Sequence, residues 1–214
     1  MSGMLYEWDV VEEKAHLLIE YPPPFLIGEF TFAPDMSQWL QEERNGDGLS
    51  NELYWVKKGE NPIHILTNFK RASAPAWSQN SNLIALIGTE IHPNQPAGPQ
   101  TLSDVENLAS YPWDLYMMNA DGSNLRVVFS KLGRPYQIRW SNKGQGLFFA
   151  GSRPNATNGG IWRLDLETNE IIRLWTYNTF FDLSPDQTQI VIIAHETKDG
   201  IERTYPLLAA VPKQ

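Results

Sequence analysis

Cysteine is absent from this chain of 214 residues, and the absence excludes disulfide bonds, thiolate zinc sites and cysteine-based catalysis. Runs of lysine and arginine are absent as well, and the formal net charge is −8. Binding to a phosphate backbone depends on clustered cations, so we expect no nucleic-acid partner. The longest apolar runs fall far short of the ~20 residues that cross a bilayer, so we expect no membrane partner either.

The N-terminal segment "MSGMLYEWDVVEEK" lacks the basic and apolar regions of a signal peptide. We therefore expect a cytoplasmic protein, and a periplasmic or secreted location stays open for a chain that has lost its signal peptide. The hydrophobic share of 42% and the charged share of 20% are typical of a soluble globular protein. Eight Trp, eight Tyr and nine Phe favour pleated, half-buried surfaces and hence β-structure.

Helical periodicity is scarce, because proline or glycine interrupts the apolar stripes that have helical spacing. The exception is "TLSDVENLA", residues 101–109, where Leu102, Val105 and Leu108 lie three residues apart behind a Thr or Ser cap. We predict a short helix there and β-structure elsewhere.

A repeat covers most of the chain. Four segments each carry an apolar residue, a small residue, a turn and then an apolar β run: "FTFAPDMSQWL", "PAWSQNSNLIALIG", "IRWSNKGQGLFFAG" and "FDLSPDQTQIVIIA". Their anchoring residues, Phe32, Trp77, Trp140 and Leu183, lie 45, 63 and 43 residues apart. A spacing near 43 to 45 is typical of one four-stranded propeller blade, and the longer spacing holds an insertion.

A second motif follows three of these anchors and predicts a hairpin. "LYWV" begins at Leu53, "LYMM" at Leu115 and "IWRL" at Ile161, and each precedes a polar turn and another β run. Read alone, "NADGSN" (residues 119–124) has the composition of a metal loop. Because it stands where the sibling motifs have hairpin turns without such ligands, we interpret it as a turn in which Gly122 supplies a positive φ.

These units predict an all-β fold: a small β-propeller of about four four-stranded antiparallel blades, in a single domain spanning residues 1–214. The expected units are an outer hairpin at 4–20 and blades near 28–67, 73–130, 136–176 and 179–209. The hairpin has no first half before it, so we predict that it closes the ring by pairing with the C-terminal strands at 180–194. An open array completed by a second copy and a fragment of a longer propeller remain as alternatives.

The units resemble the propeller repeats of the TolB family. The family pattern is a W-S-P-D-G turn, a strand and a Y-x-M/V-D-x-D-G-S hairpin. It survives as "WSQN" from Trp77, "WSNKG" from Trp140, "SPD" from Ser184 and "LYMMNADGSN" from Leu115. The resemblance implies a propeller fold and transfers no specific role. This chain departs from the family, whose propellers usually have six or more blades and whose full-length TolB is exported and carries a separate N-terminal α/β domain.

Long loops mark the expected working surface. The loop between the second and third strands is long in every unit, at residues 45–51, 90–113, 152–160 and 195–200, and in a propeller these loops project from one face. Long loops on a rigid scaffold commonly carry binding sites. The candidate binding-face residues are His92, Asp104, Glu106, Tyr111, Trp113, Arg153 and His195.

Familiar catalytic patterns are missing, since the histidines have no HxH or HExxH spacing and no GxSxG motif occurs. We therefore expect no catalytic, cofactor-binding or metal-binding residues and no cofactor. The leading hypothesis is a non-enzymatic module that binds a protein or peptide through the long-loop face. One alternative is a small-ligand-binding or hydrolytic propeller with its site at the ring axis, where Asp35, Arg139 and Asp182 are the charged residues. The other is a half-propeller completed by homodimerisation.

Overall fold

The structure is a computed structural model of the whole chain. It describes residues 3–21, 30–44, 51–65, 69–90, 113–132, 137–142, 144–152, 159–176, 179–198 and 201–211. The regular elements within these ranges are all strands. The described part contains no helix that is long and apolar enough to span a membrane. The helix predicted at 101–109 lies outside the described residues.

Five antiparallel sheets succeed one another along the chain. The N-terminal hairpin consists of β1 (Gly3–Asp9) and β2 (Lys14–Tyr21). Blade I contains β3 (Phe30–Phe32), β4 (Gln38–Arg44), β5 (Asn51–Lys57) and β6 (Ile63–His64). Blade II contains β7 (Phe69–Trp77), β8 (Leu83–Glu90), β9 (Trp113–Asn119) and β10 (Arg126–Leu132). Blade III contains β11 (Gln137–Trp140), β12 (Gly146–Gly151), β13 (Gly160–Asp165) and β14 (Ile171–Trp175), and the terminal sheet contains β15 (Phe181–Leu183), β16 (Gln189–Lys198) and β17 (Ile201–Ala210).

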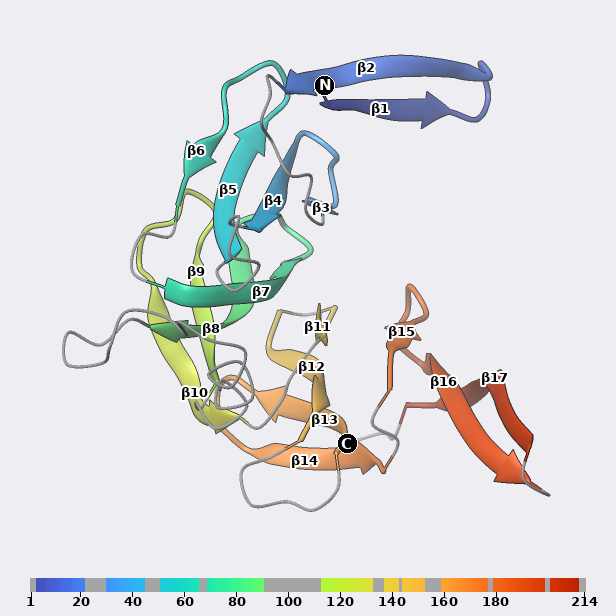
Figure 1. Cartoon of the computed structure of the whole chain (residues 1–214). Coiled ribbons are helices and arrows are strands. Elements are labelled where there is room, and N and C mark those ends of the chain that lie inside the picture. Colours follow the sequence, from blue (N-terminus) through green and yellow to red (C-terminus); the bar gives the residue numbers. More distant parts are fainter. Residues whose placement is uncertain are drawn as a thin grey trace, which may run out of the picture.

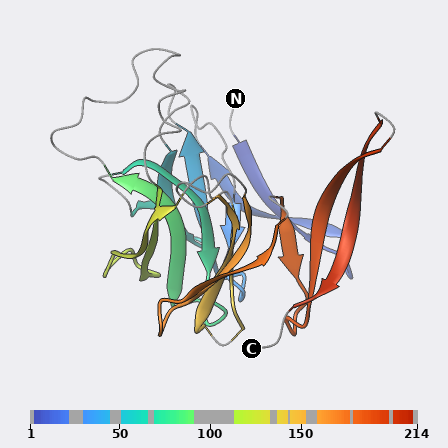
Figure 2. The same ribbon diagram turned by 90° about the horizontal axis from the view of Figure 1, so that it is seen from below.

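The sheets follow an open arc, with the hairpin at one end and the terminal sheet at the other (Figures 1 and 2). Each anchor is the last residue of the first strand in its sheet: Phe32 ends β3, Trp77 ends β7, Trp140 ends β11 and Leu183 ends β15. The predicted all-β propeller of about four blades is confirmed, and the terminal sheet is the fourth blade, with three described strands.

Packing between neighbouring blades forms the core. One cluster joins blade II to blade III, and its fully buried members include Ile87 and Leu115 on one side and Leu147 and Phe149 on the other. Successive residues of a strand point to opposite faces of the sheet, so a continuous apolar run covers two neighbours at once. Full burial of one such side chain contributes about 1.5–3 kcal/mol. The apolar runs that follow the anchors therefore hold the blades together.

Hydrogen bonds from the tryptophan anchors tie each blade to the one before it. The indole N–H of Trp77 donates to the carbonyl of Thr31 in blade I at 2.9 Å. The indole N–H of Trp140 donates to the carbonyl of Ala76 in blade II at 2.8 Å. Both acceptors lie on the first strand of the preceding blade, so each bond sets the position of one inner strand relative to the next.

The terminal sheet is tied to blade III in a different way. Its anchor is Leu183, whose side chain has no donor. Instead, the side-chain amide of Gln137 in blade III donates to the carbonyl of Phe181 at 2.7 Å and accepts from the N–H of Phe181 at 3.0 Å. A buried glutamine thus replaces the indole, and the link between inner strands is kept.

The predicted pairing of the N-terminal hairpin with the C-terminal strands needs correction. Among the described residues, β1 pairs with β2 alone, and β17 pairs with β16 alone. Ile190, seven residues after its anchor, stands opposite Ala209, just as Leu147 stands opposite Leu164 in blade III. β17 therefore fills the third-strand place that the hairpin was expected to take.

The loop predicted at 195–200 is mostly strand. β16 continues to Lys198, and its last four residues pair with the first four of β17, so that Glu196 stands opposite Arg203. The polar residues of this segment suggested a loop. Strand pairing is made by backbone groups, however, so polar residues can form a strand as apolar ones do. Only residues 199–200 separate the two strands.

We expect Leu147→Ala to destabilise the protein by about 2–5 kcal/mol, because the side chain is fully buried between blades II and III and its removal leaves a cavity. Val127→Ala, at a side chain on β10 that is 45% exposed, should change the free energy of unfolding by less than about 0.5 kcal/mol. Urea unfolding followed by tryptophan fluorescence measures both. Equal effects of the two substitutions would contradict a core located between the blades.

Candidate functional site

Two cavities lie beside the tight turns of blades II and III. The larger has a volume of about 480 Å³ and is lined by Leu83, Met117, Met118, Asn119, Asn124, Leu125 and Arg126. The smaller has a volume of about 430 Å³ and is lined by Ser78, Gln79, Asn80, Leu83, Trp140, Asn142 and Gly144. Leu83 lines both cavities; the first is lined by blade II alone, and the second lies between blades II and III. We call the combined feature the inter-blade groove.

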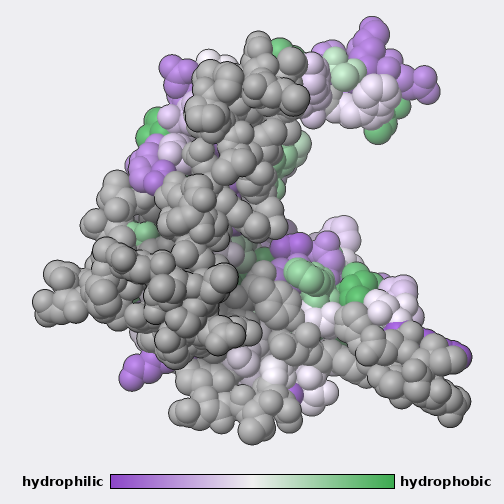
Figure 3. All heavy atoms as spheres, in the orientation of Figure 1, coloured by the Kyte–Doolittle hydropathy of each residue, from purple (hydrophilic) through white to green (hydrophobic). Residues whose placement is uncertain are grey.

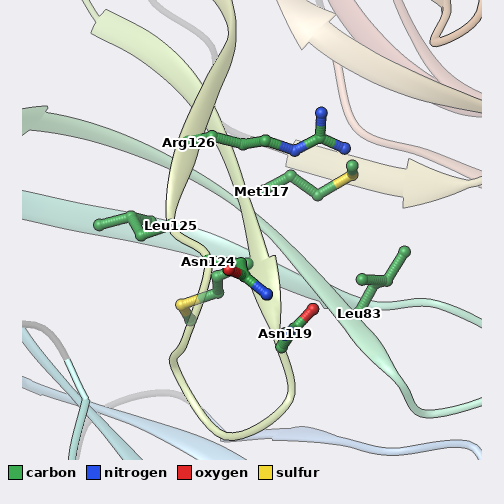
Figure 4. A pocket seen from close by; sticks show the side chains of 7 residues that line it. Leu83, Met117, Asn119, Asn124, Leu125 and Arg126 are labelled. Carbon is green, nitrogen blue, oxygen red and sulfur yellow. The ribbon is translucent and has the colours of Figure 1, made fainter.

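The floor of the inter-blade groove is apolar and its rim is polar. Met117 and Trp140 are almost fully buried beneath it. Arg126 on β10 stands opposite Met117 on β9, and the two side chains extend side by side (Figure 4). Asn119 and Asn124 flank the same cavity at either end of the hairpin turn (Figure 4). The groove therefore offers an apolar surface bordered by carboxamides and one cation.

Side-chain amides hold the other half of the rim in place. Gln79 donates to Oδ1 of Asn142 at 2.7 Å, which joins the tight turn of blade II to that of blade III. Asn142 donates to the carbonyl of Pro185 at 2.8 Å, and Gln187 donates to the carbonyl of Trp140 at 2.7 Å. These amide contacts link three successive turns along this face of the arc.

The turn "NADGSN" shapes the outer end of the groove. Asp121 accepts hydrogen bonds from the hydroxyl of Ser123 at 2.6 Å and from its N–H at 2.9 Å, and both bonds lower the pKa of the carboxyl group. Gly122 has a φ of +83°, and a Cβ added there would lie 3.1 Å from Cβ of Ile65. The segment connects β9 to β10, so its interpretation as a hairpin turn is confirmed.

The binding-face residues predicted from the sequence are mostly outside the described ranges, which leave out His92, Asp104, Glu106, Tyr111 and Arg153. Trp113 begins β9, is half-buried and packs against the cluster between blades II and III. His195 lies in β16 opposite Thr204. These last two residues belong to different sheets, and the long-loop face stays a prediction.

The sequence alone did not reveal the inter-blade groove, because the presence of each lining residue can be explained by a place in the core or in a turn. Met117 and Trp140 are core residues, and Asn119 belongs to a turn. One signal was present in the repeat. Gln79 and Asn142 both stand where the TolB-family turn W-S-P-D-G has proline, and these two carboxamides meet at the boundary of their blades.

Comparisons with known proteins place the fold. No family model and no curated protein matches the sequence. Among solved structures, TolB from Acinetobacter baumannii aligns with a TM-score of 0.63 at 13% sequence identity, and the alignment covers 97% of this chain and 46% of that one. The fold is that of a TolB-like β-propeller.

Two other solved structures show how varied the proteins with this fold are. An oligogalacturonate lyase in complex with manganese aligns with a TM-score of 0.65 at 13% identity, covering 96% of this chain and 53% of that one. A chain of a nidogen/laminin complex aligns with a TM-score of 0.60 at 13% identity, covering 90% of this chain and 70% of that one. The TolB-like propeller thus spans about half the length of TolB and of the lyase. At these identities the likeness shows the fold alone.

Metal ligands are sparse in the described part of the TolB-like propeller. One group there, Asp9, Glu12 and His16, brings three ligand atoms within 4.8 Å of one another. The group lies at the turn of the N-terminal hairpin, where Asp9 accepts hydrogen bonds from the N–H groups of Val11 and Glu12. Turn geometry accounts for the position of Asp9, and the group carries no further sign of an ion site.

The charged residues expected at the ring axis do not converge. Arg139 in blade III and Asp182 in the terminal sheet form an ion pair with an N–O distance of 3.1 Å. Asp35 lies in the turn after β3, where its carboxylate accepts a hydrogen bond from the N–H of Ser37. Within the described residues, Arg139 and Asp182 thus bind each other and Asp35 binds within its own turn, so the three charged residues expected at the axis all have local partners.

We expect Ser123→Ala to raise the pKa of Asp121 toward the ordinary value, because the serine hydroxyl is the main cause of the lowering. The pKa of Asp121 is lower in the folded state than in the unfolded state, so its ionised carboxylate stabilises the fold. This contribution is fully present above about pH 4 and is lost as the pH falls through the folded-state pKa. A carboxyl-carbon NMR titration measures the change. Asp186, which Ser184 holds in the same way, should not move and is the internal control. An unchanged titration of Asp121 would contradict the turn geometry.

Proposed function

We propose that this TolB-like propeller is a non-enzymatic binding module for a protein or peptide partner. The observation that supports the proposal most directly is the inter-blade groove, whose apolar floor and carboxamide rim lie on a face held in shape by amide hydrogen bonds. Sites that bind without rearrangement keep more of their interaction free energy, because less conformational entropy is lost on binding. The nidogen/laminin complex also contains this fold in a protein–protein assembly.

The chemistry of the groove favours an extended peptide segment. A carboxamide side chain offers one acceptor and two donor hydrogens, which suits the alternating N–H and C=O groups of an extended main chain. The floor at Leu83 and Met117 accepts an apolar side chain of that segment. The exposed guanidinium of Arg126 favours a carboxylate close by, since an arginine pairs with carboxylates in a bidentate way. The proposed ligand is therefore an extended peptide with an acidic residue next to an apolar one.

The long-loop face is the second surface of the proposed module. It rests on the loop lengths at 45–51, 90–113 and 152–160, which the sequence shows and the described residues mostly leave out. Strands of a blade alternate in direction, so the loops after second strands leave the blade at the end opposite to the tight turns. The two surfaces therefore make separable contributions, and substitutions can test each alone.

A catalytic or small-ligand function at the ring axis is the second candidate, and the likeness to a manganese-bound lyase is the observation that favours it. Such a site needs carboxylates or histidines that converge from several inner strands. Arg139 and Asp182 instead neutralise each other. A binding module fits the described residues better than a catalyst does.

Selection from a phage-displayed library of random peptides tests the proposed function. Wild-type protein should enrich peptides that combine an acidic and an apolar residue. Leu125→Asp and Arg126→Glu should each weaken binding of an enriched peptide by at least about tenfold, because they alter the wall and the cation of the groove. Val127→Asp is the matched control, since it places a carboxylate on the same strand outside the groove lining.

A deletion of residues 93–110 separates the two surfaces. It should leave the protein folded and leave the groove-selected peptides bound with unchanged affinity. If the deletion abolishes binding while the groove variants keep it, the long-loop face is the binding site and the groove assignment is wrong. If no peptide is enriched and no variant changes capture, the binding-module proposal itself fails.

A further inference from the structure

Blades II and III each use their two faces for different neighbours. The residues seven and nine positions after the anchor pack against the preceding sheet, and those eight and ten positions after it pack against the following sheet. The three clusters between sheets obey this rule. Their members at these positions include Leu40 with Ile84 and Leu86, Ala85 and Ile87 with Leu147 and Phe149, and Phe148 and Ala150 with Ile190 and Ile192.

The third strand follows the same rule. Tyr116 and Met118 in blade II stand opposite Leu86 and Ile84 and share their cluster with blade I. Trp162 and Leu164 hold the same places in blade III and share a cluster with blade II. The exposed fractions of these third-strand side chains lie between 0% and 7%. A propeller strand at this position is therefore buried by the sheet before it.

The N-terminal hairpin carries the same motif without that burial. "LYEW" in β1 aligns with "LYMM" in β9, so Tyr6 and Trp8 hold the places of the buried third-strand residues. Tyr6 is 51% exposed and Trp8 is 60% exposed. Leu17 stands opposite Tyr6 on the same face and is 50% exposed. We call these three residues the hairpin face, and none of the clusters between the described sheets includes them.

The terminal sheet exposes apolar residues on its other face, at the positions that pack against a following sheet in blade III. Val191 and Ile193 lie eight and ten positions after the anchor, where blade III has Phe148 and Ala150, which are 3% and 0% exposed. Val191 and Ile193 are only half-buried. Leu208, opposite Val191 on β17, is 64% exposed. We call Val191, Ile193 and Leu208 the terminal face, and none of the clusters between the described sheets includes these residues.

The two faces match by the rule that orders the blades. By that rule, a preceding sheet would bury the hairpin face, and a following sheet would bury the terminal face. Within one chain they lie at opposite ends of the arc, and open space separates these ends in the space-filling view (Figures 1 and 3). We propose that the hairpin face of one copy of this chain packs on the terminal face of a second copy, so that the copies join head to tail. Such an interface is heterologous, and each copy keeps one free end until a ring closes.

The experiment uses one variant that disrupts each face. Trp8→Glu places a charge on the hairpin face, and Leu208→Asp places one on the terminal face. In analytical ultracentrifugation, the average mass of the wild-type protein should rise with concentration. Each variant should have a dissociation constant for self-association that is raised at least about tenfold, so it should be largely monomeric at the same concentrations. Mixing the two variants should give a complex of one copy of each and nothing larger, because one intact face remains on each partner.

The matched control is Val11→Glu, at an apolar side chain in the turn of the same hairpin that is 89% exposed but outside the hairpin face. It should associate as the wild type does. Circular dichroism confirms that each variant is folded, and complex formation in the mixture is itself evidence of intact folds. The proposal is independent of the inter-blade groove, which lies on a different face.

Two results would overturn the head-to-tail assembly. One is wild-type protein that stays monomeric up to high concentration; protection of Trp8 from hydroxyl-radical oxidation in that monomer would indicate closure within one chain. The other is a mixture of the two variants that shows no association although the wild type associates, which would place the contact on some other surface.

Discussion

Face-to-face packing between sheets is the constraint on which this structure depends. A blade with apolar residues on both faces is stable only when another sheet covers each face. Phe149 and Ala150 are neighbours on β12, point to opposite sides and are both fully buried, one toward blade II and one toward the terminal sheet. The groove and the two exposed faces follow from this constraint. The groove lies where packing between blades II and III ends at their tight turns, and the exposed faces lie on the first and last of the described sheets.

Hydrogen bonds decide how the packed sheets are aligned. The indole of Trp140 and the side-chain amide of Gln137 each bind a backbone group on a neighbouring inner strand. A single bond of this kind contributes about 0.5–1.5 kcal/mol net, whereas each fully buried apolar side chain contributes about 1.5–3 kcal/mol. Packing therefore supplies most of the stability, and the bonds select one alignment among those that packing alone would allow. The carboxamides of the tight turns extend this selection to the surface, where they shape the groove.

The blades were predictable from the sequence because the anchors and turns repeat locally. The position of the hairpin was not, because the choice between β1 and β17 for the third-strand place depends on pairing over the whole length of β16. The extension of β16 was missed since polar residues pair through the same backbone groups as apolar ones. The groove was missed because Leu83, Met117 and Trp140 meet only after three strands are packed. The periodicity of a sequence indicates which residues share a face of one strand. The groove is formed by residues of several strands, so periodicity does not predict it.

Residue-resolved amide hydrogen exchange at low protein concentration tests this account most directly. If packing on both faces is what stabilises a sheet, the amides of β8 and β12 should exchange most slowly, since both faces of these strands are buried. The amides of β1 and β2 should exchange fastest, and raising the concentration should protect them as the hairpin face becomes covered. Equal protection of the hairpin and of the central strands in dilute monomer would contradict the account.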